Sequence, residues 1–296
     1  MSIFRGEDVF KRSGLVSLSD LKSSEYHKIF SELEIEDHAF LAKEAEFRSP
    51  GYRWQRDAMH YWSSIWEYPY TYYHLKEHAA ALGLGFEAKV VDLGSAVTFF
   101  PFAIAKLGYH VSCLDIEPAY EPDIQRAVAV VPHQPGKVDF RLISDGRLPF
   151  KDGEVNAVYC ISVLEHIPDF ENSIREVFRI LKPKGLFVLT FDIDLCGYRD
   201  ISIGRYYDLR RCLLEHFDLK EPEITVHPLD VLQPRNGPFP FMTYSKWQEY
   251  KFYIKQRIKP LFGRKPFYNL HFPFVNICVW AGVMTKRNEH NSTQGS

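Results

Sequence analysis

The chain has 296 residues, 46% of them hydrophobic, with 36 basic and 38 acidic side chains and a formal net charge of −2. This length allows one large domain with additions and a substantial core, and the balanced charge argues against a dedicated nucleic-acid binder, which needs clustered cations. Five cysteines without C-x-x-C spacing indicate reduced thiols and a cytoplasmic protein, and the lack of a long apolar run predicts no stable membrane association.

The first 85 residues are predicted to form a helical extension before the core. Its most distinctive part, from Tyr52 to Tyr73, is rich in Trp and Tyr interleaved with polar side chains. Two explanations stay open, because aromatic residues dominate core contacts in any protein. The segment either packs an added helix onto a sheet or forms an aromatic lid that excludes water from a bound ligand.

The segment His74-Leu75-Lys76-Glu77-His78 has the H-x-x-E-H spacing of inverted zinc peptidases. Two histidines four residues apart on a helix can share a metal ion, but no third ligand is indicated nearby. We therefore predict no metal site, and we expect both histidines to be exposed on a helix that leads into the core.

A βαβ unit follows, and it is the most informative feature of the chain. The apolar residues Val90, Val91 and Leu93 are typical of a buried strand, which stops at Gly94. A short helix from Phe100 and a second strand over 109–114 come next, and the second strand ends at Asp115. This arrangement predicts a carboxylate beside the ribose of a nucleotide-like cofactor bound at the carboxyl ends of the strands.

The turn after the first strand distinguishes between cofactors. A dinucleotide needs G-x-G-x-x-G, so that backbone N–H groups can hold a pyrophosphate. Here Ala96 and Phe99 replace the second and third glycines, and a bulky Phe conflicts with the close packing of helix on strand. Asp92, inside the first strand, is also foreign to the dinucleotide pattern and suits a cofactor without phosphates.

The same alternation continues downstream. Apolar residues recur at helical spacing from Glu171 to Leu181, and Pro183 and Gly185 are predicted to end this helix. Residues 187–191 are apolar and β-rich, as expected for a strand buried on both faces. Strands alternating with helices of this length predict an α/β fold with a doubly wound sheet.

Several segments, in this order, resemble the class I S-adenosylmethionine-dependent methyltransferases over about residues 86–192. Val91-Asp92-Leu93-Gly94 resembles the first motif of that family, and Asp115 resembles its ribose-binding acid. The stretch 144–150 is similar to the segment whose Asp contacts the adenine amino group. Residues 157–167 resemble the fourth strand with its turn, and 176–188 resemble the next helix, turn and fifth strand.

The resemblance implies a seven-stranded Rossmann-like methyltransferase core over residues 86–286, with S-adenosyl-L-methionine as cofactor and S-adenosyl-L-homocysteine as product. It also implies which residues bind the cofactor: Asp92, Gly94, Ser95, Asp115, Ile116, Asp145, Gly146, Arg147, Ile161 and Ser162.

One departure concerns the family's glycine-rich G-x-G-x-G loop, which here is Gly94-Ser95-Ala96-Val97-Thr98. We expect the amino-acid end of the cofactor to be held differently, with help from the aromatic segment upstream. A methyl sulfonium is a cation, and aromatic faces with a nearby carboxylate suit it. We therefore hypothesise that Trp66, Glu67 and Tyr68 line the cofactor or substrate pocket.

An insertion over 228–270 separates the sixth strand from a closing antiparallel strand at 276–284. Its aromatic content argues against disorder, and Tyr244–Leu261 is predicted to be a helix with an apolar face bordered by cations. A solvated face, contact with an anionic substrate and contact with a membrane surface all stay open, the last as a minor option. Residues 287–296 are polar and are predicted to be a disordered tail.

His166, directly after the fourth strand, is the first candidate for a catalytic proton acceptor, because substrates dock at this edge of the sheet. The turn Ser162-Val163-Leu164-Glu165 lacks the Asn/Asp-Pro-Pro-aromatic tetrad of enzymes that methylate bases in nucleic acids. Together with the charge balance, this favours methyl transfer to an oxygen or nitrogen of a small molecule. A non-catalytic cofactor-binding subunit or regulator is the alternative, and an NAD-dependent oxidoreductase is disfavoured; the oligomeric state stays open.

Overall fold

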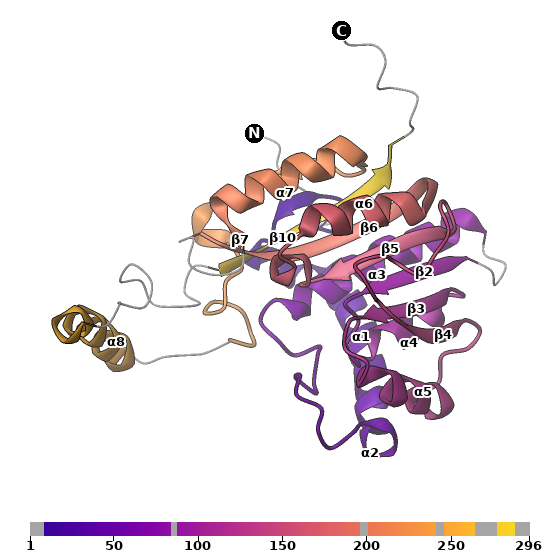
Figure 1. Ribbon diagram of the computed structural model, residues 1–296, viewed down its shortest axis with the longest axis horizontal. Helices are drawn as coiled ribbons and strands as arrows, with labels where there is room; N and C mark the ends of the chain where they lie inside the picture. The colour runs from indigo at the N-terminus through magenta and orange to yellow at the C-terminus, as the bar shows by residue number, and fades with distance from the viewer. Residues whose placement is uncertain (1–8, 84–87, 196–200, 241–245, 264–276, 288–296) are drawn as a thin grey trace, which may run out of the picture.

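A single sheet of ten strands forms the centre of the protein in the computed structural model (Figure 1). The structure describes residues 9–83, 88–195, 201–240, 246–263 and 277–287. The main path of the sheet runs β4-β3-β2-β5-β6-β10, and β8 pairs with β10. These seven strands are β2 (Lys89–Leu93), β3 (His110–Asp115), β4 (Lys137–Leu142), β5 (Val155–Ile161), β6 (Leu181–Asp194), β8 (Phe217–Leu219) and β10 (Ile277–Lys286).

Strand directions follow the doubly wound pattern. β2 to β6 pair in parallel, whereas β10 is antiparallel to both β6 and β8. The seven-stranded core and its antiparallel closing strand are therefore confirmed. The sheet is extended by three short strands that the sequence did not predict: β1 (Ser13–Leu15), β7 (Ile201–Ser202) and β9 (Glu223–Ile224).

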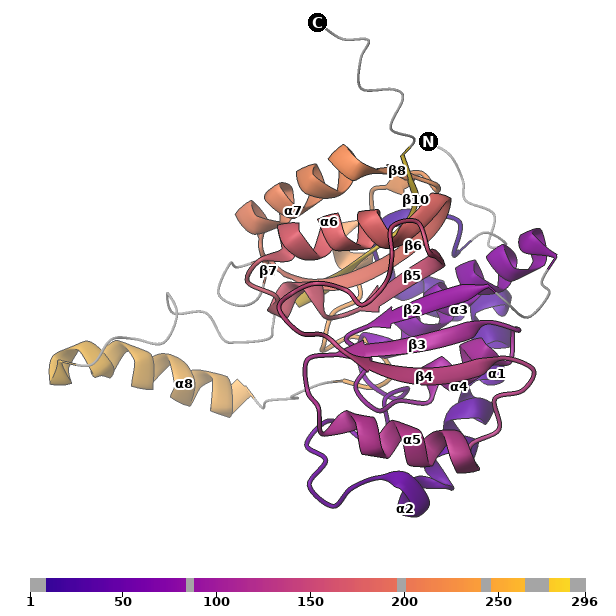
Figure 2. The ribbon, with the colours of Figure 1, turned by 45° about the vertical axis from the view of Figure 1, so that its right-hand side comes forward.

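Helices cover both faces of the sheet and bury two hydrophobic cores. On one face α1 (Ser24–Leu41), α3 (Ser64–Leu82) and α4 (Phe100–Ala105) pack together, with α5 (Tyr120–Val130) beside β4. On the other face lie α6 (Phe170–Ile180) and α7 (Ile203–His216), as Figure 2 shows. The shorter elements are α2 (Glu44–Phe47), η1 (Leu18–Lys22), η2 (Leu164–His166), η3 (Pro228–Asp230) and η4 (Lys259–Phe262).

The predicted helix at 171–181 is α6, and its start is explained by a cap. Asp169 accepts a hydrogen bond from the backbone N–H of Asn172 (3.0 Å), which satisfies one of the free N–H groups of the first turn. Ile174 and Val177 are buried on the face toward the sheet. The next strand begins at once: β6 starts at Leu181, before Pro183, so the strand is longer than the predicted 187–191.

The aromatic segment upstream of the core supplies most of α3. Trp62, Trp66 and Tyr70 are fully buried, so for these residues packing of an added helix is the correct explanation. The helix ends at Gly83, whose φ of +59° suits the left-handed C-cap position.

The two histidines on α3 correct one prediction. His74 is buried rather than exposed, and its Nε2 lies 2.9 Å from the carbonyl oxygen of Phe10. His78 is half-buried, and its Nδ1 lies 2.9 Å from the hydroxyl of Tyr109. Burial lowers the pKa of His74 to about 3 and that of His78 to about 4, so both imidazoles are neutral packing residues at neutral pH.

The predicted helix at 244–261 is α8 (Lys246–Ile258), followed by η4. Figures 1 and 2 both show α8 apart from the sheet and its helical layers. Trp247, Tyr250 and Ile254 on this helix are exposed, with Lys251 and Lys255 beside them. Among the described residues, no helix is both long and apolar enough to cross a membrane. The predicted tail lies outside the described residues except for Arg287, which pairs with Asp218.

Candidate cofactor and active site

The loop that follows β2 depends on the absence of a side chain at Gly94. Gly94 has φ +79°, and its N–H donates to the carbonyl oxygen of Leu114 (2.8 Å). A Cβ atom at this position would lie 2.5 Å from a methyl carbon of Val163, on the turn after β5. The loop after β2 and the turn after β5 therefore touch at the carboxyl edge of the sheet, where doubly wound folds bind their ligands.

Ala96 occupies the second glycine position of the family loop and keeps its backbone shape. Its φ is +46°, a left-handed conformation that costs a residue with a Cβ about 1 kcal/mol or more. The loop is stabilised by Asp115, which accepts from the N–H of Ala96 (3.1 Å) through Oδ2 and from the N–H of Glu117 (3.0 Å) through Oδ1. Next to Asp115, the side chain of Ile116 is 77% exposed at the same edge.

The N-terminal extension holds this loop through Tyr52, the first residue of the aromatic segment, and Arg48, which the sequence analysis did not single out. Arg48 donates from Nη1 to the carbonyl oxygen of Val97 (3.2 Å), and the Tyr52 hydroxyl lies 3.3 Å from both the nitrogen and the oxygen of Val97. The guanidinium of Arg48 stacks 4.2 Å from the centre of the Tyr52 ring. Nothing in the local sequence marks Arg48, because its partner is backbone 49 residues away.

The segment after β4 presents Asp145 and Gly146, both with positive φ (+57° and +67°). The side-chain amide of Asn172 donates to the carbonyl oxygen of Gly146 (3.1 Å), and the N–H of Arg147 donates to the carbonyl oxygen of Ser144 (3.3 Å). Asp145 and Arg147 are exposed.

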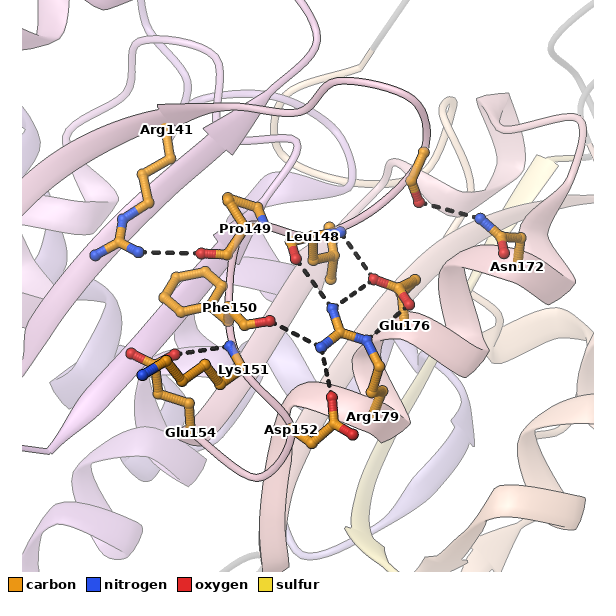
Figure 3. Close-up of polar contacts among 11 residues, drawn as sticks. Arg141, Leu148, Pro149, Phe150, Lys151, Asp152, Glu154, Asn172, Glu176 and Arg179 are labelled. Carbon is orange, nitrogen blue, oxygen red and sulfur yellow. Dashed lines mark hydrogen bonds and ion pairs between the residues drawn. The ribbon is translucent and has the colours of Figure 1, made fainter.

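One arginine of α6 organises the chain just after this segment, as Figure 3 shows. The Arg179 guanidinium donates to the carbonyl oxygens of Leu148 (3.0 Å) and Phe150 (2.8 Å). It also pairs with the carboxylates of Asp152 (2.8 Å) and Glu176 (2.7 Å), and the N–H of Leu148 donates to Glu176 (2.8 Å). This network fixes the backbone from 148 to 152 and so limits where the Asp145 turn can lie.

A buried carboxylate connects α3 to the turn after β5. Glu67 is fully buried, and its Oε1 accepts a 2.6 Å hydrogen bond from the hydroxyl of Ser162. Ser162 itself has φ +50°, a strained conformation of the kind that gathers at functional sites. Ile161, the last residue of β5, is half-buried directly before it.

Two further buried carboxyl groups lie at the same edge. Burial raises the pKa of Asp92 to about 7 and that of Glu165 to about 8, and it also raises the pKa of Glu67. Glu165 Oε1 accepts from the N–H of Asp192 (3.2 Å). The hydroxyl groups of Ser95 and Tyr159 lie beside Asp92, and that of Thr190 lies beside Glu67. Two buried oxygens, Glu67 Oε2 and Glu165 Oε2, have no hydrogen-bond partner within the described part of the chain.

The remaining predicted residues differ in position. The Tyr68 ring packs against Phe99 (5.2 Å between ring centres) and Phe100 (4.8 Å), beside the loop after β2. Trp66 instead stacks on Tyr70 (4.6 Å) in the core beneath the N-terminal segment. His166 ends η2 and is exposed, next to Glu165 on the edge where β5 ends.

Comparison with known proteins identifies the family. Residues 91–189, which run from within β2 to within β6 and include the turns after β2, β3, β4 and β5, match the family described as a methyltransferase domain. The chain contains a methyltransferase domain of the class I S-adenosylmethionine-dependent type. The cofactor of this class is S-adenosylmethionine, which excludes the dinucleotide alternative.

Named relatives of this methyltransferase share only part of its length. A ubiquinone biosynthesis O-methyltransferase from Xylella fastidiosa is 28% identical over 126 residues, which are 42% of this chain and 50% of the relative. The sterol 24-C-methyltransferase erg-4 from Neurospora crassa is 30% identical over 134 residues, 43% of this chain and 35% of the relative. The chain thus spans about half the length, or less, of these curated relatives.

Among solved structures, a putative sarcosine dimethylglycine methyltransferase from Galdieria sulphuraria superposes with a TM-score of 0.47 at 16% identity. The superposition covers 73% of this chain and 84% of that one.

The residues at the carboxyl edge fit S-adenosylmethionine. The cofactor carries a sulfonium and an α-amine, both cationic, an α-carboxylate, and hydroxyl and amino groups that donate hydrogen bonds. The edge offers carboxyl and hydroxyl groups, two of the carboxyl oxygens buried without a partner, and the described residues there include no cluster of cations that would suit a pyrophosphate. The donor set of the ligand and the acceptor set of this methyltransferase therefore match.

Replacing Ala96 by Gly should stabilise the protein. Glycine adopts φ +46° without a Cβ clash, so we expect a gain of about 0.5–1 kcal/mol in the free energy of unfolding after the extra entropy of the unfolded chain is subtracted. Urea denaturation followed by tryptophan fluorescence measures it. Gly94→Ala is the matched control and should destabilise by several times as much; equal effects of the two changes would contradict this account.

Replacing Arg179 by Met should loosen the chain from Leu148 to Asp152. Two carbonyl oxygens and two carboxylates lose their donor, which we expect to cost about 1–3 kcal/mol of stability. Hydrogen exchange at the amides of 147–153 should accelerate. Arg175→Met, on the same helix with only an exposed pair to Glu171, serves as control and should change stability by less than about 0.5 kcal/mol. Unchanged exchange in the Arg179 variant would refute the role of this network.

Proposed function

We propose that this methyltransferase transfers a methyl group from S-adenosylmethionine to an oxygen or nitrogen atom of a small molecule. The observation that carries the proposal is the buried Glu67–Ser162 hydrogen bond at the end of β5, beside Glu165 and His166. It brings acidic groups and a candidate proton acceptor to the edge where doubly wound folds bind substrates.

The cofactor residues are assigned by position along this edge. Asp115 and Ile116, after β3, would hold the ribose hydroxyls and one face of the adenine. The turn of Asp145, Gly146 and Arg147 would contact the adenine amino group. The amino-acid end and the sulfonium would lie between the turn after β2 and the turn after β5. The residues around this place are Asp92, Gly94, Ser95, Ile161 and Ser162.

Of Trp66, Glu67 and Tyr68, which we expected to line the cofactor or substrate pocket, we assign two to it. Glu67 and Tyr68 reach the turns after β5 and β2, respectively, so we assign them to the wall of the pocket. A buried carboxylate next to a cation is stabilising, because each compensates the desolvation of the other. Trp66 supports the same helix from the core side.

Bound S-adenosylmethionine supplies an electrophilic methyl group. The protein's own residues must then hold the acceptor atom in line and keep water out, which accounts for much of the rate in such transfers. A hydroxyl acceptor must also lose its proton as the new C–O bond forms, whereas a neutral amine attacks first and loses its proton afterwards. We assign the proton acceptor role to His166, with Glu165 behind it to stabilise the imidazolium.

Small-molecule acceptors are supported by two features. The relatives named above are a ubiquinone biosynthesis O-methyltransferase and a sterol methyltransferase, both named for small organic acceptors. The net charge of −2 gives no general attraction for nucleic acid. The alternative, a subunit that binds the cofactor without catalysis, was suggested by the missing glycines; Ala96 retains the left-handed turn, which weakens that reason.

The test is methyl transfer from methyl-labelled S-adenosylmethionine into three fractions of a cell extract: small molecules, RNA and protein. We expect label in the small-molecule fraction. With an isolated hydroxyl acceptor, His166→Asn should lower kcat about 100-fold, while S-adenosylhomocysteine affinity, measured by calorimetry, should not change. Label in RNA or protein would overturn the substrate class, and wild-type kcat in the variant would overturn the role of His166. Binding of cofactor without transfer into any fraction would favour the non-catalytic alternative.

The affinity for S-adenosylmethionine should depend on pH more strongly than the affinity for its product, S-adenosylhomocysteine. The pKa values of Asp92 and Glu165, about 7 and 8, mean that these groups ionise as the pH rises from about 6 to 9. Ionised carboxylates attract the cationic sulfonium of S-adenosylmethionine but not the neutral thioether of S-adenosylhomocysteine. The ratio of the two affinities should therefore rise by about tenfold across this range.

Glu67→Gln should reduce the rise of that ratio with pH, because burial raises the pKa of Glu67 and the variant removes a carboxylate that forms as the pH rises. Glu154→Gln is the control, since Glu154 precedes β5 at the opposite edge of the sheet and pairs with Lys89. Isothermal calorimetry with both ligands from pH 6 to 9 measures the effect. A ratio that is independent of pH in the wild type would place the sulfonium away from these carboxyl groups.

A further inference from the structure

Outside the cofactor site, α1 and the segment before α3 gather a second cluster of titratable groups. Asp37, Asp57 and His60 each offer one ligand atom, and these three atoms lie within 4.8 Å of one another. Glu34 and His38, one turn away on α1, form a similar group with His60. None of these residues belongs to the methyltransferase motifs, and sequence analysis predicted no metal site.

The carboxylate of Asp37 is the unusual member of this cluster. Asp37 is 1% exposed, and among the described residues no N–H or hydroxyl group donates to its oxygens; its polar neighbours are the carboxyl group of Asp57 and the imidazole of His60. Its Oδ2 faces His60 Nδ1 at 3.9 Å, which is too long for a hydrogen bond. Burial and the neighbouring Asp57 carboxylate raise the pKa of Asp37 to about 7.

Two other buried aspartates of the protein have charged partners. Asp20 is 2.9 Å from the guanidinium of Arg12 and also accepts from the N–H of Ser17. Asp123 accepts from the N–H and the hydroxyl of Ser49 and pairs with Arg126. A buried ionised carboxylate without donors is costly, and either protonation or a bound cation removes that cost. A cation bound beside Asp37 would compensate its charge.

His60 is held in position for such a ligand. Its Nδ1 lies 2.9 Å from both carboxylate oxygens of Asp57, and its Nε2 lies 3.2 Å from Oε1 of Glu34. Its ring packs edge-on against Phe30 and Phe239, with ring centres 6.1 and 5.0 Å apart. Metal-binding histidines commonly donate their second N–H to a carboxylate, which fixes the ring orientation and the tautomer. Glu34 is placed to accept that hydrogen bond.

We propose that Asp37, Asp57 and the Nδ1 atom of His60 bind one divalent transition-metal ion, for which Zn²⁺ is the probe, with Glu34 orienting the imidazole. One imidazole with two carboxylates suits Zn²⁺ and its neighbours in the first row, whereas Mg²⁺ and Ca²⁺ prefer oxygen ligands alone. The ion would compensate the charge of Asp37 and separate the two carboxylates from each other.

The location suggests what this ion does. It connects α1 to the segment that leads into α3, and α3 carries Glu67 one heptad after His60. Phe239, from the insertion before β10, packs on the same histidine. An ion here would hold together the extension, the start of α3 and the insertion, at a distance from the reacting atoms. Its role is structural, and it does not depend on which substrate is methylated.

The experiment uses the full, tag-free chain, stripped with a chelator and then titrated with Zn²⁺, Mn²⁺ or Mg²⁺. We expect one equivalent of Zn²⁺ to bind by calorimetry, and we expect a rise in Tm of about 5 °C at a hundredfold excess over Kd. Mg²⁺ should have no such effect. The metal content of the native protein can be measured by mass spectrometry.

Matched variants locate the site. Asp37→Asn keeps the shape of the side chain and removes the buried charge, so it should fold at least as well without metal and lose the Zn²⁺-dependent rise in Tm. His60→Gln should also lose it. His110→Gln, which breaks a similar imidazole–carboxylate pair with Asp139 on the surface, should keep it.

Three outcomes would overturn the proposal. The first is no stoichiometric Zn²⁺ binding to the wild type, which would mean that Asp37 is simply protonated. The second is binding that survives both Asp37→Asn and His60→Gln. The third is binding that His38→Gln abolishes and Asp37→Asn does not, which would assign the ion to the opposite nitrogen of His60.

Discussion

The hydrogen bond between Glu67 and Ser162 is the interaction on which the rest of the site depends. A fully buried carboxylate is stable only beside donors or a cation, and this one lies beside the hydroxyl groups of Ser162, Thr190 and Ser63. It therefore requires α3 to pack tightly on the sheet, and it requires the turn to keep Ser162 at positive φ. The extension and the methyltransferase core thus form one site.

The N-terminal extension affects the cofactor loop from its other side. Arg48 and Tyr52 hold Val97 by its backbone, and Asp123 of α5 anchors the same segment through Ser49. The family loop is usually shaped by glycines, which cost little in left-handed conformations. Here contacts from outside the loop hold a conformation that Ala96 alone would disfavour. The extension therefore stabilises a loop that contains alanine in place of glycine.

Neighbouring residues of the aromatic segment lie in two different places, the core and the turns of the sheet. Trp66 and Tyr70 lie in the core, whereas Glu67 and Tyr68 face the turns of the sheet. An α-helix turns by about 100° per residue, so adjacent positions point in different directions. A helix between two layers can thus serve as core on one side and as pocket wall on the other. His74 follows the same rule and points into the core.

The sequence by itself determined the doubly wound sheet, the order of its motifs and the cofactor class, because these depend on local patterns: apolar runs, Gly94 at a turn, and Asp115 at the end of a strand. It did not reveal that β6 begins at Leu181, that His74 is buried, or that Arg48, Tyr52 and Arg179 hold the loops. Only the tertiary structure decided these points, as it did the cluster of Asp37, Asp57 and His60. In each case the partner is distant in the chain, and whether a polar side chain is solvated or buried depends on what packs over it.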